Sequence, residues 1–223
     1  MNSYNSYPTI IDATREETAG LLAKVLGITA IGFLITAGGV ATAPPWGMFV
    51  GMIAVFALVF AINFARRRNA TMALSLFLAL TYFMGWEIAP IIHSYIRTIG
   101  PAVVFNAAVT TGLGMAVMGS VAYLFNIDYR RVTGIAMAGL MVLIVAGLLS
   151  MFLHFMQPST YSWLTLGVFS LLTVGDFARI RAAAKQGVDN SSAVVLALSI
   201  YLDAINIFLA VLQLMGGNGR RRS

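Results

Sequence analysis

Two aspartates inside long apolar runs are the residues of this chain best placed to do chemistry together. Asp176 and Asp203 lie on either side of the turn expected at 187–190, almost equally far from it. At about 1.5 Å of rise per residue, two helices joined by that turn carry the carboxylates within roughly one turn of the same depth. If the faces that carry them meet, the two aspartates share one site.

Such a pair can serve several kinds of chemistry. Two carboxylates in a low-dielectric site cannot both ionise cheaply, so the pair tends to hold one proton between them. The pair can sense pH near neutrality, bind a hard cation such as Ca²⁺ through its oxygens, or act as an aspartyl catalytic dyad. The structural alternative is a neutral hydrogen bond that locks two helices together.

The last apolar segment, 191–215, is predicted to be a helix with one polar face along its whole length. Its polar residues recur every seven positions: Ser192, Ser199, Asn206 and Gln213. Asp203 lies on the adjoining stripe, and residues three and four apart share a helix face. Because a charge at bilayer depth costs about 2.5–3.5 kcal/mol on insertion scales, this face must meet other helices or water. The segment is therefore predicted to lie inside a bundle, with Ser199 and Asn206 supporting the aspartates.

Three arginines follow the second apolar run, at Arg66, Arg67 and Arg68. Membrane topology and contact with lipid headgroups account for them in the simplest interpretation. In the alternative, one of them reaches Asp176, which lies toward the same side, and plugs a path until the aspartate is protonated.

Glu87 lies inside the third apolar run, toward its outer end. It either lines an outer vestibule or sits at the membrane interface beside Trp86. His93 and His154 are single histidines without metal-ligand spacing, and the chain has no cysteine. Any metal is therefore expected at Asp176 and Asp203, and no organic cofactor is expected.

The composition is that of a multi-pass membrane protein. Of the 223 residues, 59% are hydrophobic and 10% are charged, and the mean hydropathy is +0.86. Soluble domains carry about 25% charged residues. The net charge of +6 comes from short clusters between apolar runs, where topology explains it, so no nucleic-acid partner is expected.

Seven membrane-spanning helices are predicted from the apolar runs. Their approximate limits are 21–41, 46–65, 71–92, 102–125, 132–156, 161–184 and 191–215. Residues 1–20 form a short polar tail in which Thr14 and Glu17 fit a helix start. Residues 21–215 form one transmembrane domain, and 216–223 form a short basic tail.

Charge in the loops predicts the orientation. The loops after spans two, four and six hold most of the Lys and Arg, whereas the alternate loops hold only Arg97. The positive-inside rule then places the N-terminus in the cytoplasm. Seven spans then place the C-terminus outside, whereas Arg220, Arg221 and Arg222 at the end of the chain favour the cytoplasm for that end. Six spans plus a re-entrant last helix would satisfy both.

Several membrane enzymes and receptors are excluded by their motifs. A retinal protein needs a lysine deep in a span, and a zinc metalloprotease needs H-E-x-x-H; neither is present. Intramembrane aspartyl proteases resemble the chain in having two intramembrane aspartates. Their Y-D and G-x-G-D motifs are not matched at Asp203 and Asp176, and the order of the motifs is reversed. An intramembrane aspartyl protease therefore stays a minor alternative, and no enzymatic activity is expected.

The chain resembles the transmembrane Bax inhibitor motif proteins, also called the lifeguard family, from about residue 20 to 215. The segment Ala197–Phe208, A-L-S-I-Y-L-D-A-I-N-I-F, is similar to the family's closing A-L-x-L-Y-L-D-x-I-N-L-F. Gly175–Ile180 is similar to its Y-D-x-x-x-I, with glycine in place of tyrosine. Phe64–Arg68 and Pro90–Tyr95 are similar to bacterial members.

This resemblance implies seven helices with the last one central and wrapped by the other six. It also implies a pH-sensitive Ca²⁺ leak in which Asp176 and Asp203 share a proton and form the pH sensor and ion site. Arg66 would act as a latch on Asp176. The expected partners are membrane lipid, Ca²⁺ and protons, and the expected location is a bacterial inner membrane.

The alternative from another class is a non-conducting membrane regulator. Its carboxylate pair would only stabilise the bundle, and it would act by binding partner proteins. Short tails offer little soluble surface for such a partner.

Overall fold

The computed structural model describes residues 10–66, 69–125, 127–186 and 190–219, and these ranges contain seven helices and no strand. Arg67 and Arg68, residues 187–189 in the expected turn, and the arginines after 219 lie outside them. The helices are α1 (Ile10–Thr42), α2 (Gly47–Ala65), α3 (Ala70–Thr98), α4 (Pro101–Leu124), α5 (Tyr129–Leu153), α6 (Pro158–Ala184) and α7 (Asn190–Gly219).

The helix ends follow local chemistry. The Asn69 side chain accepts a 2.8 Å hydrogen bond from the Thr71 N–H at the start of α3. The Asp128 side chain accepts a 3.0 Å hydrogen bond from the Arg130 N–H at the start of α5. Pro101 begins α4, where a missing N–H costs nothing. These residues stop and start the helices at the membrane-spanning lengths.

Three predicted boundaries were wrong. α7 continues to Gly219, so half of the tail expected at 216–223 is helical. α1 begins at Ile10 rather than at Thr14, so half of the expected polar tail is helical. α3 continues to Thr98, beyond the predicted end at 92, and carries Pro90 within it. Proline is tolerated in a membrane helix because neighbouring groups satisfy the freed carbonyl.

All seven helices are long and apolar enough to cross a membrane, so the chain is an integral multi-pass membrane protein. The largest exposed apolar side chains lie on the outer helices, for example Phe56 and Phe60 on α2 and Phe152 on α5. α7 is a continuous helix of 30 residues, which does not support the re-entrant alternative.

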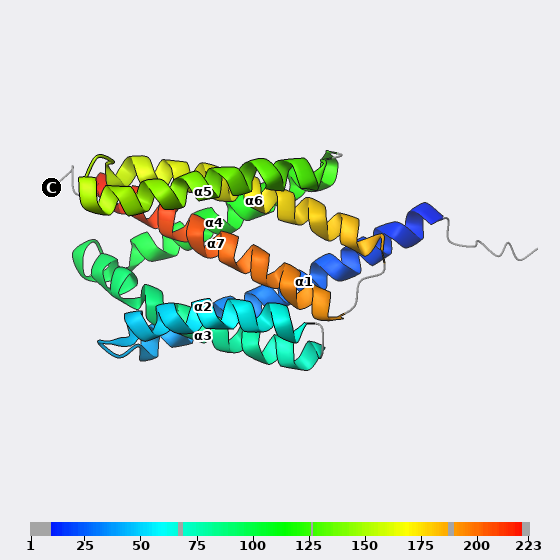
Figure 1. Ribbon diagram of the computed structural model, residues 1–223, viewed down its shortest axis with the longest axis horizontal. Helices are drawn as coiled ribbons and strands as arrows, with labels where there is room; N and C mark the ends of the chain where they lie inside the picture. The colour runs from blue at the N-terminus through cyan, green and yellow to red at the C-terminus, as the bar shows by residue number, and fades with distance from the viewer. Residues whose placement is uncertain (1–9, 67–68, 126, 187–189, 220–223) are drawn as a thin grey trace, which may run out of the picture.

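α7 is the most buried span of the bundle. Of its most apolar stretch, 72% is buried inside the protein, compared with at most 44% for any other helix. It runs diagonally between a layer of α5 and α6 and a layer of α2 and α3 (Figure 1). Four helices, α1, α3, α4 and α6, pack extensively on it, while α2 packs on α3 and α5 packs on α6.

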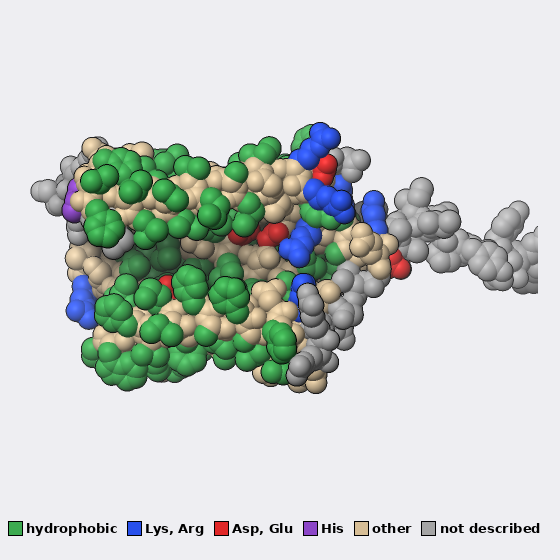
Figure 2. Space-filling model, in the orientation of Figure 1, with side chains coloured by type: hydrophobic (Ala, Val, Ile, Leu, Met, Phe, Trp, Pro, Cys, Tyr) green, Lys and Arg blue, Asp and Glu red, His purple; other side chains and the backbone are tan. Residues whose placement is uncertain are grey.

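Basic side chains gather at one end of the bundle, where α1 begins (Figure 2). On the described residues these are Arg66, Arg130, Arg131, Arg179, Arg181 and Lys185, near the ends of α2, α4, α5 and α6. The opposite end carries Arg97 at the end of α3. The charge asymmetry expected from the loops is therefore present in three dimensions.

Candidate functional site

The two aspartates lie on facing helices in the interior of the bundle. Asp176 on α6 is 7% exposed and Asp203 on α7 is 5% exposed. α6 and α7 pack closely along their length, and the charge of Asp176 acts on Asp203. The structure thus brings together the two carboxylates that counting from the turn placed at similar depth.

Thr173, one turn before Asp176 on α6, contacts the other aspartate. Its hydroxyl donates a 2.7 Å hydrogen bond to the Phe169 carbonyl and lies 3.4 Å from Oδ2 of Asp203. A hydroxyl carries a single hydrogen. Good hydrogen bonds to both oxygens therefore need a second hydrogen, which only a protonated Asp203 can bring.

Asp176 has different neighbours. The Ser199 side chain, one turn before Asp203 on α7, forms a hydrogen bond with Asp176. The positive charge of Arg179, one turn farther along α6, also acts on Asp176. Besides the other carboxylate and a hydroxyl, Asp176 therefore has a cation near it, whereas Asp203 has the other carboxylate and a hydroxyl. Electrostatically the site is asymmetric.

Asn206 does not join this cluster. Its side-chain N–H donates to the Leu202 carbonyl of its own helix at 2.8 Å. Farther along the same interface, Ser162 of α6 donates a 2.6 Å hydrogen bond to Oε1 of Gln213 on α7. The polar face predicted for the last helix thus meets α6 at two separate places rather than as one continuous cluster.

Arg66 lies directly after α2, is half-buried, and donates its backbone N–H to the Ile62 carbonyl. Among the residues that the structure describes, the one ion pair joins Arg131 to Asp128 at 3.3 Å. Arg66 and Asp176 therefore form no ion pair in this state, and Arg179 is the arginine whose charge acts on Asp176.

Glu87 is half-buried on α3, away from the aspartate pair. Its Oε2 and the Nε1 of Trp86 are buried without hydrogen-bond partners on the described residues. α2 crosses directly over it, since a Cβ on Gly51 would lie 2.8 Å from the Glu87 nitrogen. The Glu87 charge acts on Tyr201 rather than on Asp203.

A buried hydroxyl pair fixes α7 next to this site. The Tyr201 and Thr36 hydroxyls are 2.6 Å apart, and Thr36 Oγ1 also lies 2.9 Å from the Thr81 carbonyl, so one contact joins α1, α3 and α7. The Tyr201 ring packs on Phe33 and Phe77, with centroids at 5.2 and 5.7 Å. Tyr201 is within two residues of Asp203, so this pin sets the depth and rotation of the aspartate.

Close packing against α5 accounts for the glycine at position 175. A Cβ there would lie 2.5 Å from Oγ1 of Thr133 on α5. The Thr133 hydroxyl is itself buried without a partner on the described residues. α5 thus approaches the backbone beside Asp176 at a position where a larger side chain would hold the helices apart.

Sequence reasoning missed Thr173 and the charge of Arg179. Both lie three residues from Asp176, which is the spacing of side chains on one helix face, so this spacing was the available signal.

No three His, Cys, Asp or Glu side chains gather as a metal site within the described ranges. The pair offers two carboxylates and two hydroxyls, which supply four oxygen ligands if each group binds through one oxygen and six if both carboxylates bind through two, against the six to eight that Ca²⁺ takes.

Comparison with known proteins gives a consistent result. The family described as Inhibitor of apoptosis-promoting Bax1 matches residues 18–220. A protein of Borreliella burgdorferi is 32% identical over 93% of this chain and 98% of its own length. A membrane protein of Streptococcus pyogenes is 30% identical over 72% of this chain and 70% of its own. A protein of Deinococcus radiodurans is 27% identical over 93% of this chain.

The family match covers all seven spans, including the helices that carry Asp176 and Asp203. The architecture found here, an all-helical bundle of seven spans, agrees with it. The chain belongs to the Bax inhibitor family.

Proposed function

We propose that this protein is a pH-sensitive Ca²⁺ leak whose pH sensor and ion site are Asp176 and Asp203. The observation that carries the proposal is the burial of two neighbouring carboxylates between α6 and α7 within membrane-spanning segments. Ionisable residues at such depth are expensive and commonly mark ion or proton pathways. The resemblance to the Bax inhibitor family supplies calcium as the ion.

The neighbours of each aspartate support a shared proton with a preferred place. Thr173 gives its hydrogen to a carbonyl at 2.7 Å, so its oxygen can accept a hydrogen bond from a protonated Asp203. Asp176 has the positive charge of Arg179 nearby in addition to the Ser199 hydroxyl, so it is the carboxylate of the pair better placed to carry the negative charge. The proposed resting state therefore has the proton on Asp203 and the negative charge on Asp176.

The oxygen ligands suit a passing ion better than a resident one. If each carboxylate and each hydroxyl binds through one oxygen, two to four positions of a Ca²⁺ shell are left to water or carbonyl groups. A weak site with exchangeable waters lets an ion enter and leave, which conduction requires.

Arg66 is proposed as a latch on Asp176. An ionised Asp176 attracts an arginine that moves toward it from the end of α2, and the pair then blocks the path. Protonation of Asp176 removes the negative charge and with it the attraction, so the path opens as the pH falls. Of the three residues expected to support the pair, Ser199 is the one in contact with it, whereas Asn206 bonds to its own helix and Glu87 lies on α3.

The proposed location is a bacterial inner membrane with the N-terminus in the cytoplasm. The basic residues gather at the end of the bundle where α1 begins, and Lys and Arg favour the cytoplasmic side. The similar proteins are bacterial as well.

Ca²⁺ entry into proteoliposomes, followed with a trapped calcium indicator from pH 5 to pH 8, tests the leak. We expect entry above that of protein-free liposomes, increasing as the pH falls. Liposomes that are no leakier than protein-free ones at every pH would refute the leak and favour the non-conducting regulator. A matched series with K⁺ in place of Ca²⁺ separates a calcium path from a general defect.

A further inference from the structure

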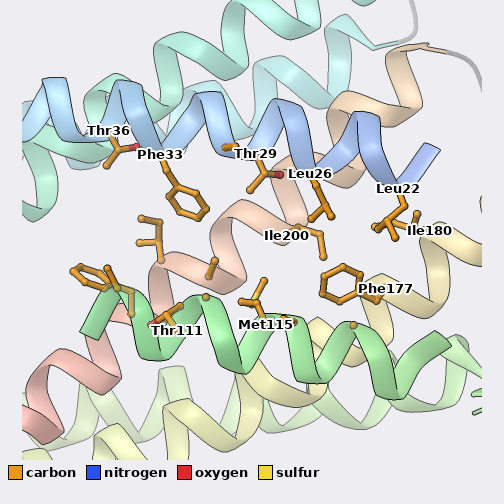
Figure 3. A pocket seen from close by; sticks show the side chains of 18 of the residues that line it. Leu22, Leu26, Thr29, Phe33, Thr36, Thr111, Met115, Phe177, Ile180 and Ile200 are labelled. Carbon is orange, nitrogen blue, oxygen red and sulfur yellow. The ribbon is translucent and has the colours of Figure 1, made fainter. Parts of the chain in front are cut away.

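A long groove on another face of α7 has no role in the site described above. It lies between α1 and α4, is floored by α7 and encloses about 1240 Å³. Figure 3 shows α1 on one side, with Leu26 and Phe33 turned inward, and α4 on the other, with Met115 facing them. Neither Asp176 nor Asp203 lines it.

The lining of the groove is almost entirely apolar, and its position is within the spans. On α1 it reaches from Thr18 to Val40, which at about 1.5 Å per residue is roughly 33 Å. This length matches the hydrocarbon core of a bilayer, about 30 Å thick. Leu26 and Phe33 on its wall are 42% and 37% exposed, so the groove is open from the lipid side.

The lining and the opening of the groove favour a hydrocarbon chain as its occupant. The groove is long, apolar and open to the lipid, so an acyl chain of the surrounding bilayer can enter it from the side. Water is disfavoured because the apolar lining offers it few hydrogen-bond partners.

One mouth of the groove is basic. Arg181 lines it, and its guanidinium donates to the carbonyls of Tyr123 and Phe125 at 3.1 and 3.3 Å, which fixes the charge at the end of α4. Glu16 and Glu17 precede the mouth on α1 without lining it. The basic residues at this end of the bundle outnumber the acidic ones in the described ranges.

We propose that this groove binds one anionic phospholipid from the leaflet at the basic end, with an acyl chain along α1 and α4 and the phosphate beside Arg181. Basic pockets between membrane helices hold anionic headgroups in this way. The site is independent of the proposed calcium leak, because none of its lining residues belongs to the aspartate cluster.

Gly112 offers a direct test of the chain-binding part. A Cβ at Gly112 meets nothing within 4 Å, so Gly112→Phe fills the groove without a clash at the backbone. Gly167 on α6 is equally open but lies outside the groove, so Gly167→Phe is the matched control. Ala116→Phe, one turn along α4, is a second groove-filling variant should the first fold poorly.

The protein is reconstituted in equal amounts of phosphatidylglycerol and phosphatidylethanolamine and re-extracted in mild detergent, and the retained lipid is quantified by mass spectrometry. We expect about one lipid per chain, enriched severalfold in phosphatidylglycerol, for the wild type and for Gly167→Phe. Both groove-filling variants should lose most of it. Retention equal in Gly112→Phe and Gly167→Phe, or no retained lipid in the wild type, overturns the proposal.

The headgroup part is tested at Arg181. Arg181→Gln should abolish the enrichment of phosphatidylglycerol over phosphatidylethanolamine, and Arg181→Lys should restore most of it. Arg130→Gln, which removes a charge outside the groove, should leave the enrichment unchanged. Equal enrichment in the wild type and in Arg181→Gln contradicts the assignment of the phosphate to this mouth.

Discussion

The Thr173 hydroxyl on α6 lies 3.4 Å from Oδ2 of Asp203 on α7. The same hydroxyl donates its hydrogen to the Phe169 carbonyl of α6 at 2.7 Å. This contact joins the two helices that carry the aspartates, one turn away from Asp176. It also gives a protonated Asp203 a partner that can accept its hydrogen bond. The chemistry proposed for the pair therefore depends on a residue that is not itself ionisable.

Replacement of Thr173 by valine should destabilise the bundle. The variant keeps the shape of the side chain but leaves Oδ2 of Asp203 without a hydroxyl neighbour. Hydrogen bonds between membrane helices average about 0.6 kcal/mol and reach about 1.7 kcal/mol, so we expect a loss in that range. Unfolding in detergent measures it, with Thr173→Ser as the near-neutral control. A loss as large for serine as for valine would show that packing, not the hydroxyl, matters here.

The Thr36–Tyr201 pin predicts unequal effects of its two deletions. Tyr201→Phe leaves Thr36 with its carbonyl partners, so the loss should be about 0.5–1.5 kcal/mol. Thr36→Val leaves the hydroxyl of the fully buried Tyr201 without its partner, which costs about 1–3 kcal/mol. The same unfolding assay should therefore rank Thr36→Val as the more damaging change, and the reverse order would contradict the geometry.

Gly175→Ala should destabilise the α5–α6 contact through a clash with Thr133. Overpacking of this kind costs about 1–3 kcal/mol. Addition of Thr133→Ala removes the clashing hydroxyl and should restore most of the loss, which a double-mutant cycle measures. Additive effects of the two changes would mean that the side chains do not meet.

The seven spans were predictable because each is an apolar run ended by proline or basic residues. α2 was placed within one residue, since Pro45 and Arg66 mark both of its ends. The end of α3 was missed because the helix continues through Pro90 into a polar segment at the interface. Hydropathy marks the part of a helix in lipid, not the part that extends beyond it.

The candidate site was predictable in depth but not in detail. Counting from the turn placed Asp176 and Asp203 at a similar level, because helical rise is constant. Which faces meet depends on the rotation of each helix, and this is set by distant contacts such as Thr36 with Tyr201 and Thr133 with Gly175. Such contacts leave no local pattern in the sequence.

Arg66→Gln tests the latch without touching either aspartate. If Arg66 closes the path by pairing with an ionised Asp176, its loss should raise Ca²⁺ entry at pH 8 several-fold, toward the level of the wild type at pH 6. Arg130→Gln, a charge change at the same end of the bundle, should leave the profile unchanged. If Ca²⁺ entry through Arg66→Gln follows the wild-type pH profile, Arg66 is not the latch. Arg179 would then be the next residue to change.

The central claim is tested most directly by the pH profile of Ca²⁺ entry for Asp203→Asn and Asp176→Asn in proteoliposomes. Asp128→Asn is the matched control, because Asp128 is exposed at the start of α5 and asparagine also caps helices. The account predicts that each site variant either loses entry or loses its dependence on pH, while Asp128→Asn follows the wild type. A wild-type profile in both site variants, at equal amounts of folded protein, would contradict it.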